Sequence, residues 1–314
     1  MDPEQNPYVP NAGAPPPALV GRERLLEAFR IALVRMKAGR TAKSLMPTGL
    51  RGVGKTVLLN RFVEMARRED YQTAYMEADE NSDFIEMLAA QLRPVLFELD
   101  RMANVTATVK RALRIFKSFT LRVGLHGLSL NFRVDPERGM ADSGDLNVDL
   151  TTLFVAIGEA ARDQGVAVLI AIDEVQYLPE GQLAAVLMAV HRTTQLQLPI
   201  LVVATGLPQL PTLAGNAKSY AERLFDFPMI GALSESDATK AIANPTESGG
   251  VTFEDDALHR LYQITEGYPF LIQKWAYHVW DYARRSPITV ADVNDVEPSV
   301  FDSLAESFLH FLVA

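Results

Sequence analysis

The chain has 314 residues, 48% hydrophobic and 22% charged, with a formal net charge of −9 and no cysteine. This composition is ordinary for a packed soluble protein of about two domains, and it excludes disulfides and thiolate metal sites. The amino end lacks the basic and apolar regions of a signal peptide, and no apolar run is long enough to span a bilayer. We therefore expect a cytoplasmic protein with no membrane partner. The negative charge argues against wholesale electrostatic binding of nucleic acid.

The amino-terminal part divides into a polar segment and a helix. Residues 1–18 are rich in Pro, Asn, Gly and Ala, which predicts a flexible segment. Residues 19–23 then lead into an amphipathic helix whose apolar positions continue to residue 36. The next apolar stretch, residues 44–46, reads as a short strand, although Pro47 follows and cannot donate a hydrogen bond to a sheet.

A phosphate-binding motif follows this strand. Gly49, Gly54, Lys55 and Thr56 fit the spacing G-x-x-x-x-G-K-[ST] of a P-loop, and the residues after it have the periodicity of a helix. Backbone N–H groups in such a turn, together with the helix N-terminus, attract phosphate. Lys55 would reach the β- and γ-phosphates, and Thr56 would hold Mg²⁺. The expected ligands are ATP or ADP and Mg²⁺, and the loop that binds them comprises Gly49, Leu50, Arg51, Gly52, Val53, Gly54, Lys55, Thr56 and Val57.

A basic segment follows the second strand (residues 72–76) and a helix (residues 83–99). Residues 101–134 contain seven Lys or Arg and no Asp or Glu. Within them, residues 120–134 alternate between apolar and other side chains, which predicts a β-hairpin, and residues 135–149 read as an acidic loop. The basic face is either simply solvated or a docking surface for a partner or a phosphate backbone.

The clearest strand in the sequence ends in two carboxylates. Residues 166–172 are continuously apolar, as in a parallel strand covered on both faces, and Asp173 and Glu174 follow at its tip. This is the Walker B pattern. Asp173 would hold Mg²⁺, and Glu174 would orient and deprotonate the attacking water.

Two further strands end the α/β pattern. Residues 199–204 form one, and Thr205 at its tip either touches the γ-phosphate or the water, or is a strand-terminal residue without a role. Residues 224–230 form the other. Arg223 precedes it and is either an arginine finger that reaches a neighbouring subunit's nucleotide or a plain surface residue.

From residue 233 the pattern is helical, with predicted helices at residues 234–243, 253–265, 269–283, 290–296 and 301–314. Gly267, Tyr268 and Pro269 separate the second helix from the third. Trp275, Tyr277, Trp280 and Tyr282 are expected in the core of this region rather than on a base-stacking platform.

These motifs resemble the AAA+ class of P-loop ATPases. The resemblance implies an α/β fold with a five-stranded parallel sheet in the order 5-1-4-3-2, followed by a small helical lid. The expected parts are a flexible segment at 1–18, a nucleotide-binding domain at 19–230 with a basic helix and hairpin insertion near 101–149, and a lid domain at 231–314.

More narrowly, the chain is similar to the STAND and origin-recognition-like branch. The resemblance rests on the box at residues 20–23, the GLRGVGKT loop, and the turn at residues 267–269. In that branch the box and the Gly-x-Pro turn flank the adenine, which implies contacts from Val20, Gly21, Arg22, Gly267 and Pro269.

The chain departs from the family pattern in two places. Many AAA+ proteins carry a sensor-2 arginine in the third lid helix, whereas residues 269–274 offer only Lys274. This favours a nucleotide-gated switch over a rapid motor. Members of the branch usually continue into a winged-helix or sensor domain, and this sequence does not, so it is either truncated or a minimal ATPase module.

Two functions are compatible with these residues. In the first, a slow Mg-dependent ATPase uses its nucleotide state to recruit an unknown protein partner or to form a homo-oligomer, in which Arg223 would complete the adjacent site. In the alternative, a DNA-associated ATPase of the initiator or transposition-helper type places its basic segment on phosphates. The acidic chain and the missing winged helix favour the first.

Overall fold

The computed structural model describes residues 1–11, 13–102, 106–125, 134–247 and 249–313. The chain divides into two compact units. The sheet unit comprises Leu26–Gly49 and Leu58–Met229, and the lid unit comprises Met1–Leu25, Leu50–Val57 and Ile230–Ala314. Each unit is therefore assembled from segments that are distant in the sequence.

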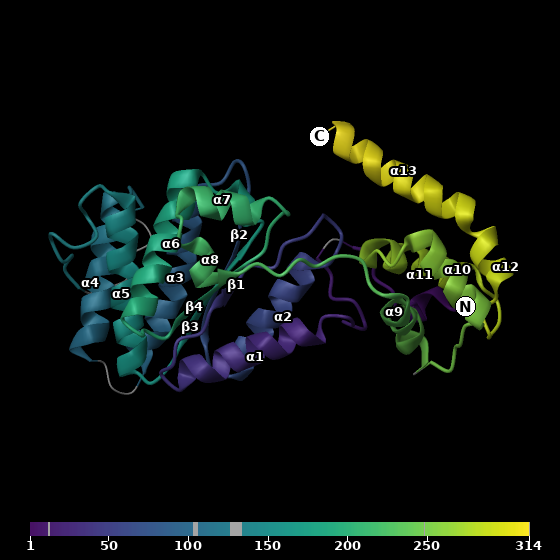
Figure 1. The fold of residues 1–314 in the computed structure, drawn as a ribbon, viewed down its shortest axis with the longest axis horizontal. Helices are drawn as coiled ribbons and strands as arrows, with labels where there is room; N and C mark the ends of the chain where they lie inside the picture. Colours follow the sequence, from purple (N-terminus) through teal and green to yellow (C-terminus); the bar gives the residue numbers. More distant parts are fainter. Residues whose placement is uncertain (12, 103–105, 126–133, 248, 314) are drawn as a thin grey trace. The chain divides into compact units, whose positions relative to one another are not determined.

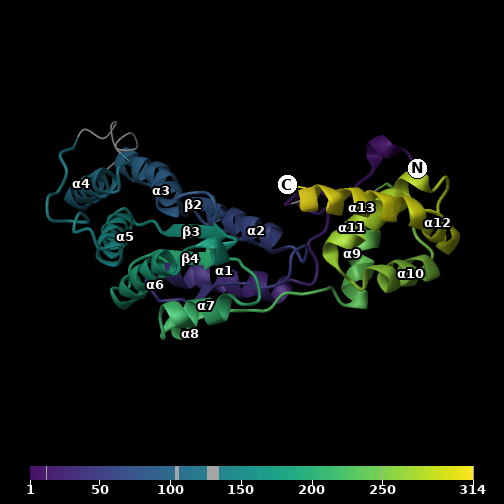
Figure 2. The same ribbon diagram turned by 90° about the horizontal axis from the view of Figure 1, so that it is seen from above.

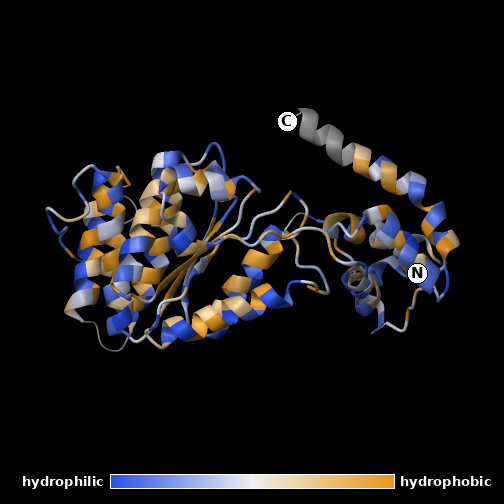
Figure 3. Ribbon diagram, in the orientation of Figure 1, coloured by the Kyte–Doolittle hydropathy of each residue, from blue (hydrophilic) through white to orange (hydrophobic). Residues whose placement is uncertain are grey.

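A parallel five-stranded sheet forms the centre of the sheet unit, in the order β2-β3-β4-β1-β5 (Figure 1). This confirms the predicted order, which is the same order counted from the other edge. All six residues of β3 are buried, as expected of a strand covered on both faces; Figure 3 shows the hydrophobic character of the sheet. The strands are β1 (Ser44–Leu45), β2 (Gln72–Glu77), β3 (Val168–Asp173), β4 (Ile200–Ala204) and β5 (Phe225–Asp226).

Helices cover both faces of this sheet (Figures 1 and 2). Helix α3 packs against β2, and α5 packs against both α4 and α6. The helices are α1 (Glu23–Lys37), α2 (Lys55–Arg68), α3 (Phe84–Arg101), α4 (Ala107–Arg122), α5 (Leu146–Asp163), α6 (Glu180–Gln195), α7 (Leu210–Ala217) and α8 (Ala221–Leu224), with a short 3-10 turn, η3 (Val175–Tyr177). The sequence analysis did not predict α7.

Proline 47 shortens β1 without ending the strand pairing. Met46 N and Thr48 N donate to the carbonyls of Asp226 and Pro228, at 2.8 and 2.9 Å. The backbone N–H groups of successive strand residues point towards opposite neighbouring strands. Pro47 therefore occupies a position whose N–H would point towards β4. The chain therefore loses a ladder bond on that side and keeps its bonds to the β5 side.

The predicted hairpin at residues 120–134 is wrong in its first strand, because residues 120–122 belong to α4. Buried positions Val109, Ala112, Phe116 and Phe119 recur at helical spacing, and Thr106 caps the helix start through the Val109 N–H. This long apolar stripe outweighs the short alternation at the end of α4. Residues 126–133 of the prediction lie outside the described part of the chain.

The predicted acidic loop at residues 135–149 is also too long, since α5 begins at Leu146 with Asp145 as its cap. Asp149 is buried, with 3% of its surface exposed. Its carboxylate accepts hydrogen bonds from Ser143 N at 2.9 Å and from Gly144 N at 3.0 Å. An acidic residue in the first turn of a helix thus holds the preceding loop against that helix.

The lid unit has its own core, formed by the helices α9 (Glu235–Glu247), α10 (Asp255–Thr265), α11 (Pro269–Tyr282), α12 (Val290–Asp295) and α13 (Glu297–Val313). Trp275 and Trp280 are buried, as predicted for core residues. Tyr282 is 48% exposed, so the expectation that it belongs to the core is wrong. None of the helices in the described ranges has the length and apolar character that a membrane span requires.

The expectation of a flexible segment at residues 1–18 is wrong for its first part. This N-terminal segment, residues 1–9, packs on α11 and α9 and includes a 3-10 turn, η1 (Pro3–Gln5). Tyr8 is 2% exposed and its hydroxyl donates to the Ile242 carbonyl. Asn6 Nδ2 donates to the Tyr277 carbonyl at 3.1 Å, and Trp280 Nε1 donates to the Asp2 carbonyl at 2.9 Å. One buried aromatic ring and these bonds order a stretch whose composition alone suggests a loose chain.

Candidate functional site

The P-loop lies between β1 and α2. Gly52 and Gly54 have φ values of 82° and 91°, which side chains other than glycine rarely adopt. A Cβ at Gly54 would meet no atom within 4 Å, so the backbone there is open to a ligand. Helix α2 begins at Lys55, whose side chain is buried and whose Nζ donates to the Leu50 carbonyl at 3.3 Å. The loop therefore has the backbone geometry and helix N-terminus of a phosphate site.

Within the lid unit, the P-loop contacts the start of α11. Phe270 N donates to the Gly52 carbonyl at 3.2 Å, and the Tyr268 hydroxyl donates to the Arg51 carbonyl. Pro269 is the first residue of α11, where its missing N–H costs nothing. The structure thus places Pro269 beside the P-loop.

Gly267 holds a close backbone approach in the same unit. Its φ is 72°, and a Cβ there would lie 2.2 Å from the Leu233 carbonyl oxygen. Leu233 N donates to the Gly267 carbonyl at 2.8 Å. The Gly-x-Pro turn is therefore fixed against the segment that enters the lid.

The box before α1 contacts both of these segments. Arg22 donates to the carbonyls of Val53 and Gly231 at 3.3 and 2.6 Å. Burial lowers the pKa of the Arg22 guanidinium, and the carboxylates of Asp237 and Glu23 oppose that shift. Gly21 has a φ of 70°, and Val20 packs on the lid core. The lid unit accordingly brings the box, the P-loop from Leu50 onwards and the Gly-x-Pro turn together.

The sheet unit places the two predicted acidic residues at the carboxyl end of β3. Asp173 is fully buried. Its Oδ1 accepts hydrogen bonds from Glu174 N at 2.9 Å and from the Thr205 hydroxyl. Its Oδ2 accepts none from the described residues. Thr205, at the end of β4, is therefore the residue that holds Asp173.

A divalent cation fits this carboxylate. A buried anionic oxygen without a hydrogen-bond donor is costly unless a cation or water satisfies it, and carboxylate oxygen is a preferred Mg²⁺ ligand. Among the described residues no group of three His, Cys, Asp or Glu side chains could hold a metal by itself. Magnesium in nucleotide sites is held by one or two protein ligands together with phosphates, so a single free carboxylate oxygen suits it.

A third carboxylate adds negative potential at this edge. Glu77 ends β2 directly opposite Asp173 in the strand register. Burial raises the pKa of the Glu77 carboxyl, and the neighbouring Asp173, Glu174 and Asp79 raise it further. The pKa of Tyr75 is likewise raised to about 12, chiefly by burial and then by Asp173 and Glu77. The surroundings of Asp173 thus favour a bound cation.

Glu174 is held by a residue that the sequence analysis did not identify. Its backbone is left-handed, with φ 50° and ψ 40°. Gln176 Nε2 donates to Glu174 Oε2 at 2.6 Å, and Leu207 N donates to Gln176 Oε1 at 3.1 Å. A glutamine in a short turn carries no motif of its own. The available signal was its position, two residues after the catalytic candidate.

The turn after β4 also joins β3 to the start of the P-loop. Gly49 N donates to the Gly206 carbonyl at 3.1 Å, and Val175 N donates to the Thr205 carbonyl at 2.9 Å. The carboxyl ends of β1, β3 and β4 therefore meet at residues 205–206, the edge at which open parallel sheets bind ligands.

Arg223 is exposed in the last turn of α8 and makes no ion pair within the described ranges. Its role as an arginine finger remains a prediction.

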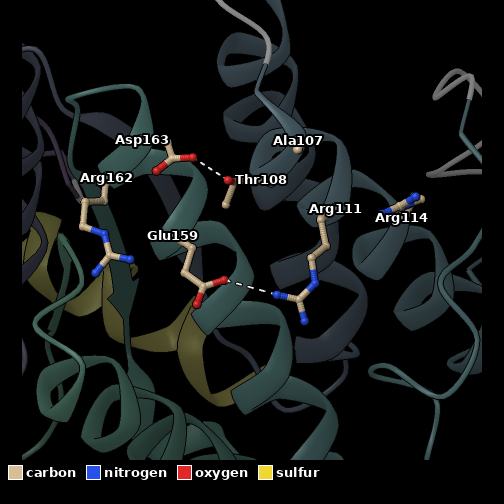
Figure 4. Close-up of a pocket in the computed structure, with 7 residues that line it drawn as sticks. All are labelled: Ala107, Thr108, Arg111, Arg114, Glu159, Arg162 and Asp163. Carbon is tan, nitrogen blue, oxygen red and sulfur yellow. Dashed lines mark hydrogen bonds and ion pairs between the residues drawn. The ribbon is translucent and has the colours of Figure 1, made fainter.

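Two arginines of the basic segment pair with carboxylates. Arg111 pairs with Glu137 and Glu159, at 3.3 and 3.5 Å, and Arg114 pairs with Glu137 at 3.3 Å. Figure 4 shows the Glu159 and Arg111 side chains turned towards each other across the groove between α5 and α4. The acidic residues that balance this segment come from elsewhere in the sequence, so the charge count of residues 101–134 overstates its positive potential.

Comparison with known proteins agrees with this geometry. The profile described as "AAA ATPase domain" matches residues 18–203. No curated protein matches the chain. A Walker-type ATPase of Pyrococcus abyssi is similar in structure, with a TM-score of 0.57 and 13% identity over 95% of this chain and 78% of that one.

Two further solved structures are similar. The Cdc6p protein of Pyrobaculum aerophilum has a TM-score of 0.54 and 13% identity, over 95% of this chain and 67% of that one. The ORC1 protein of Aeropyrum pernix, solved in complex with DNA, has a TM-score of 0.51 and 11% identity, over 91% of this chain and 66% of that one. At these identities the likeness concerns the fold, and part of each of these proteins has no counterpart here.

Proposed function

The chain belongs to the AAA ATPase domain family, and from that premise we propose that it is a Mg-dependent ATPase that acts as a slow, nucleotide-gated switch. The observation that carries the proposal is Asp173, a fully buried carboxylate whose Oδ2 has no donor among the described residues. A P-loop without such an acid would be compatible with phosphate binding alone.

Each predicted residue has a role in this proposal. Lys55 and the P-loop N–H groups would bind the phosphates, and Thr56 and Asp173 would hold Mg²⁺. The bound cation would neutralise charge that develops on the phosphates. Glu174 would accept a proton from the attacking water, and Thr205 would keep Asp173 oriented.

The switch would operate through the lid. Val20, Gly21, Arg22, Gly267 and Pro269 are proposed to flank the adenine, and Arg22 already contacts Val53 of the P-loop. Residues 19–230 would then form the nucleotide-binding domain. Residues 231–314 would form the lid, and residues 1–9 would be part of it. Membership of the STAND and origin-recognition-like branch is part of the same proposal.

Two variants test the site. Lys55→Ala is expected to abolish ATP binding, measured by isothermal titration with MgATP. Glu174→Gln is expected to bind ATP and to lose turnover, measured by phosphate release. Retained micromolar affinity in the first variant, or unchanged turnover in the second, would contradict the assigned roles.

Turnover against protein concentration tests the assembly. If Arg223 completes a neighbouring site, specific activity rises with concentration and Arg223→Ala removes the rise. Arg192 is another exposed arginine of the sheet unit, and Arg192→Ala is therefore the matched control. A low rate that is independent of concentration and of Arg223 would mean a monomeric switch.

A DNA-associated role is the second candidate, and its specific support is the structural similarity to an ORC1 protein solved with DNA. Phosphate contacts make affinity fall steeply with salt. The ion pairs of Arg111 and Arg114 predict weak binding with a shallow salt slope. This is measured by fluorescence anisotropy of duplex DNA between about 50 and 200 mM salt. Tight binding with a steep slope would favour the DNA role.

A further inference from the structure

We propose that Gln176 is the positioning residue for Glu174 and that it connects Glu174 to the turn after β4. This inference rests on the proposed function, because it takes Glu174 as the group that activates water. Gln176 lies in the short turn η3, on the opposite side of Glu174 from Asp173 in the sequence.

The hydrogen bonds fix which way the Gln176 amide faces. Leu207 N can only donate, so the atom that meets it at 3.1 Å must be the amide oxygen. The amide nitrogen therefore points the other way and donates to Glu174 Oε2 at 2.6 Å. This arrangement fixes the position of the Glu174 carboxylate.

The backbone that carries Glu174 and Gln176 is itself held by hydrogen bonds. Val175, between the two residues, is buried, and its N–H donates to the Thr205 carbonyl at 2.9 Å. Glu174 N donates to Asp173 Oδ1 at 2.9 Å. The backbone on either side of the partly exposed Glu174 side chain is thus fixed, and Gln176 holds its carboxylate.

Gly206 provides the space that Gln176 occupies. A Cβ at Gly206 would lie 2.8 Å from Gln176 Oε1, closer than such atoms normally pack, and 3.0 Å from Leu210 Cδ2, which is a tight contact. Any larger residue at 206 would have to displace the amide or the Leu210 side chain. The same glycine accepts the hydrogen bond from Gly49 N at 3.1 Å, so one turn contacts the first P-loop glycine, Asp173 through Thr205, and Glu174 through Gln176.

A mispositioned general base lowers the rate of the chemical step without weakening substrate binding, and a shift of about 1 Å costs about 100-fold. Gln176→Leu removes the donor and acceptor at similar volume, so kcat for ATP is expected to fall about 100-fold while KM stays within about twofold of the wild-type value. Gln176→Glu has nearly the same shape but places a carboxylate against Glu174. We expect Gln176→Glu to be at least as slow as Gln176→Leu. If Gln176 only filled space, Gln176→Glu would be the faster of the two variants, because its shape is nearly unchanged.

The decisive measurement is a double-mutant cycle in single-turnover ATP hydrolysis with the full chain and MgATP. In a Glu174→Gln background, Gln176→Leu is expected to cause no further loss, because the residue it positions is already removed. Gln209→Leu, an exposed glutamine two residues past Leu207, is the matched control and is expected to leave both parameters unchanged. If Gln176→Leu distorts the turn, Gly206→Ala perturbs the same amide from its other side and is expected to give the same kcat loss without a change in KM.

The outcomes separate the two ideas. A kcat loss in Gln176→Leu that disappears in the Glu174→Gln background supports the positioning role. Turnover that depends on Glu174 but not on Gln176, a change confined to KM, or an equal loss in both backgrounds overturns the inference and leaves the proposed function standing. A wild-type chain that does not hydrolyse ATP, or a Glu174→Gln variant that turns over at the wild-type rate, overturns both.

Discussion

Replacing Tyr8 tests whether the N-terminal segment is part of the lid. An aromatic side chain buries about 150–250 Å², and Tyr8 is only 2% exposed. At about 25 cal/mol per Å² its burial contributes about 4–6 kcal/mol as an upper bound. Tyr8→Ala is therefore expected to destabilise the lid by about 3–5 kcal/mol. Tyr8→Phe, which removes the hydroxyl bonded to the Ile242 carbonyl, is expected to cost about 1 kcal/mol.

Hydrogen exchange followed by mass spectrometry measures this locally, since the lid can open without the sheet. Exchange in α9 and α11 is expected to accelerate roughly fivefold in Tyr8→Phe and about 140- to 4,000-fold in Tyr8→Ala, because about 1.4 kcal/mol corresponds to a factor of ten. Tyr282→Ala, at a position that is 48% exposed in α11, is the control and should change exchange little. Unchanged protection of α9 and α11 in Tyr8→Ala would refute the reasoning.

Three other results follow from the structure. Burial raises the pKa of the Tyr8 hydroxyl above the usual value of about 10, so the stability that the hydroxyl contributes is present below about pH 10 and is lost at higher pH. The difference in melting temperature between wild type and Tyr8→Phe should therefore shrink above about pH 10. A constant difference would contradict the assignment. Gly267→Ala places a Cβ 2.2 Å from a carbonyl oxygen at a φ of 72°. It should destabilise the lid by more than about 1 kcal/mol, measured by hydrogen exchange. Gly231→Ala is the control, because its Cβ would have no atom within 4 Å, and it should not destabilise the lid. Thr205→Val removes a donor to the buried Asp173 carboxylate and should lower the free energy of unfolding in urea by about 1.5–3 kcal/mol. Thr205→Ser keeps the hydroxyl and should largely retain the wild-type stability. Equal stability of the two variants would show that this hydrogen bond contributes nothing.

The sequence contained enough information for the sheet and for its acidic edge. The continuous apolar run of β3 can only be a strand covered on both faces, and the residues that follow such a strand lie at the ligand edge. Asp173 and Thr205 could therefore be predicted separately. Their hydrogen bond could not, because it depends on the ends of β3 and β4 lying at the same level.

The errors have a common physical origin. Composition describes what a segment does alone, whereas residues 1–9 are ordered by a surface of α9 and α11 that lies more than 230 positions away in the sequence. Alternation over a few residues is likewise ambiguous at the end of a helix, as in α4. Gln176 was overlooked because its role depends on the Leu207 N–H across the sheet edge, a contact that no local pattern indicates.

The start of the chain has a practical consequence for protein production. The Met1 ammonium donates to the carbonyls of Trp280 and Ala283 at the carboxyl end of α11, where positive charge is favourable. Trimming the chain to residue 18, where the family profile begins, would uncover the surface beneath Tyr8. Fragments for expression should therefore retain the first nine residues.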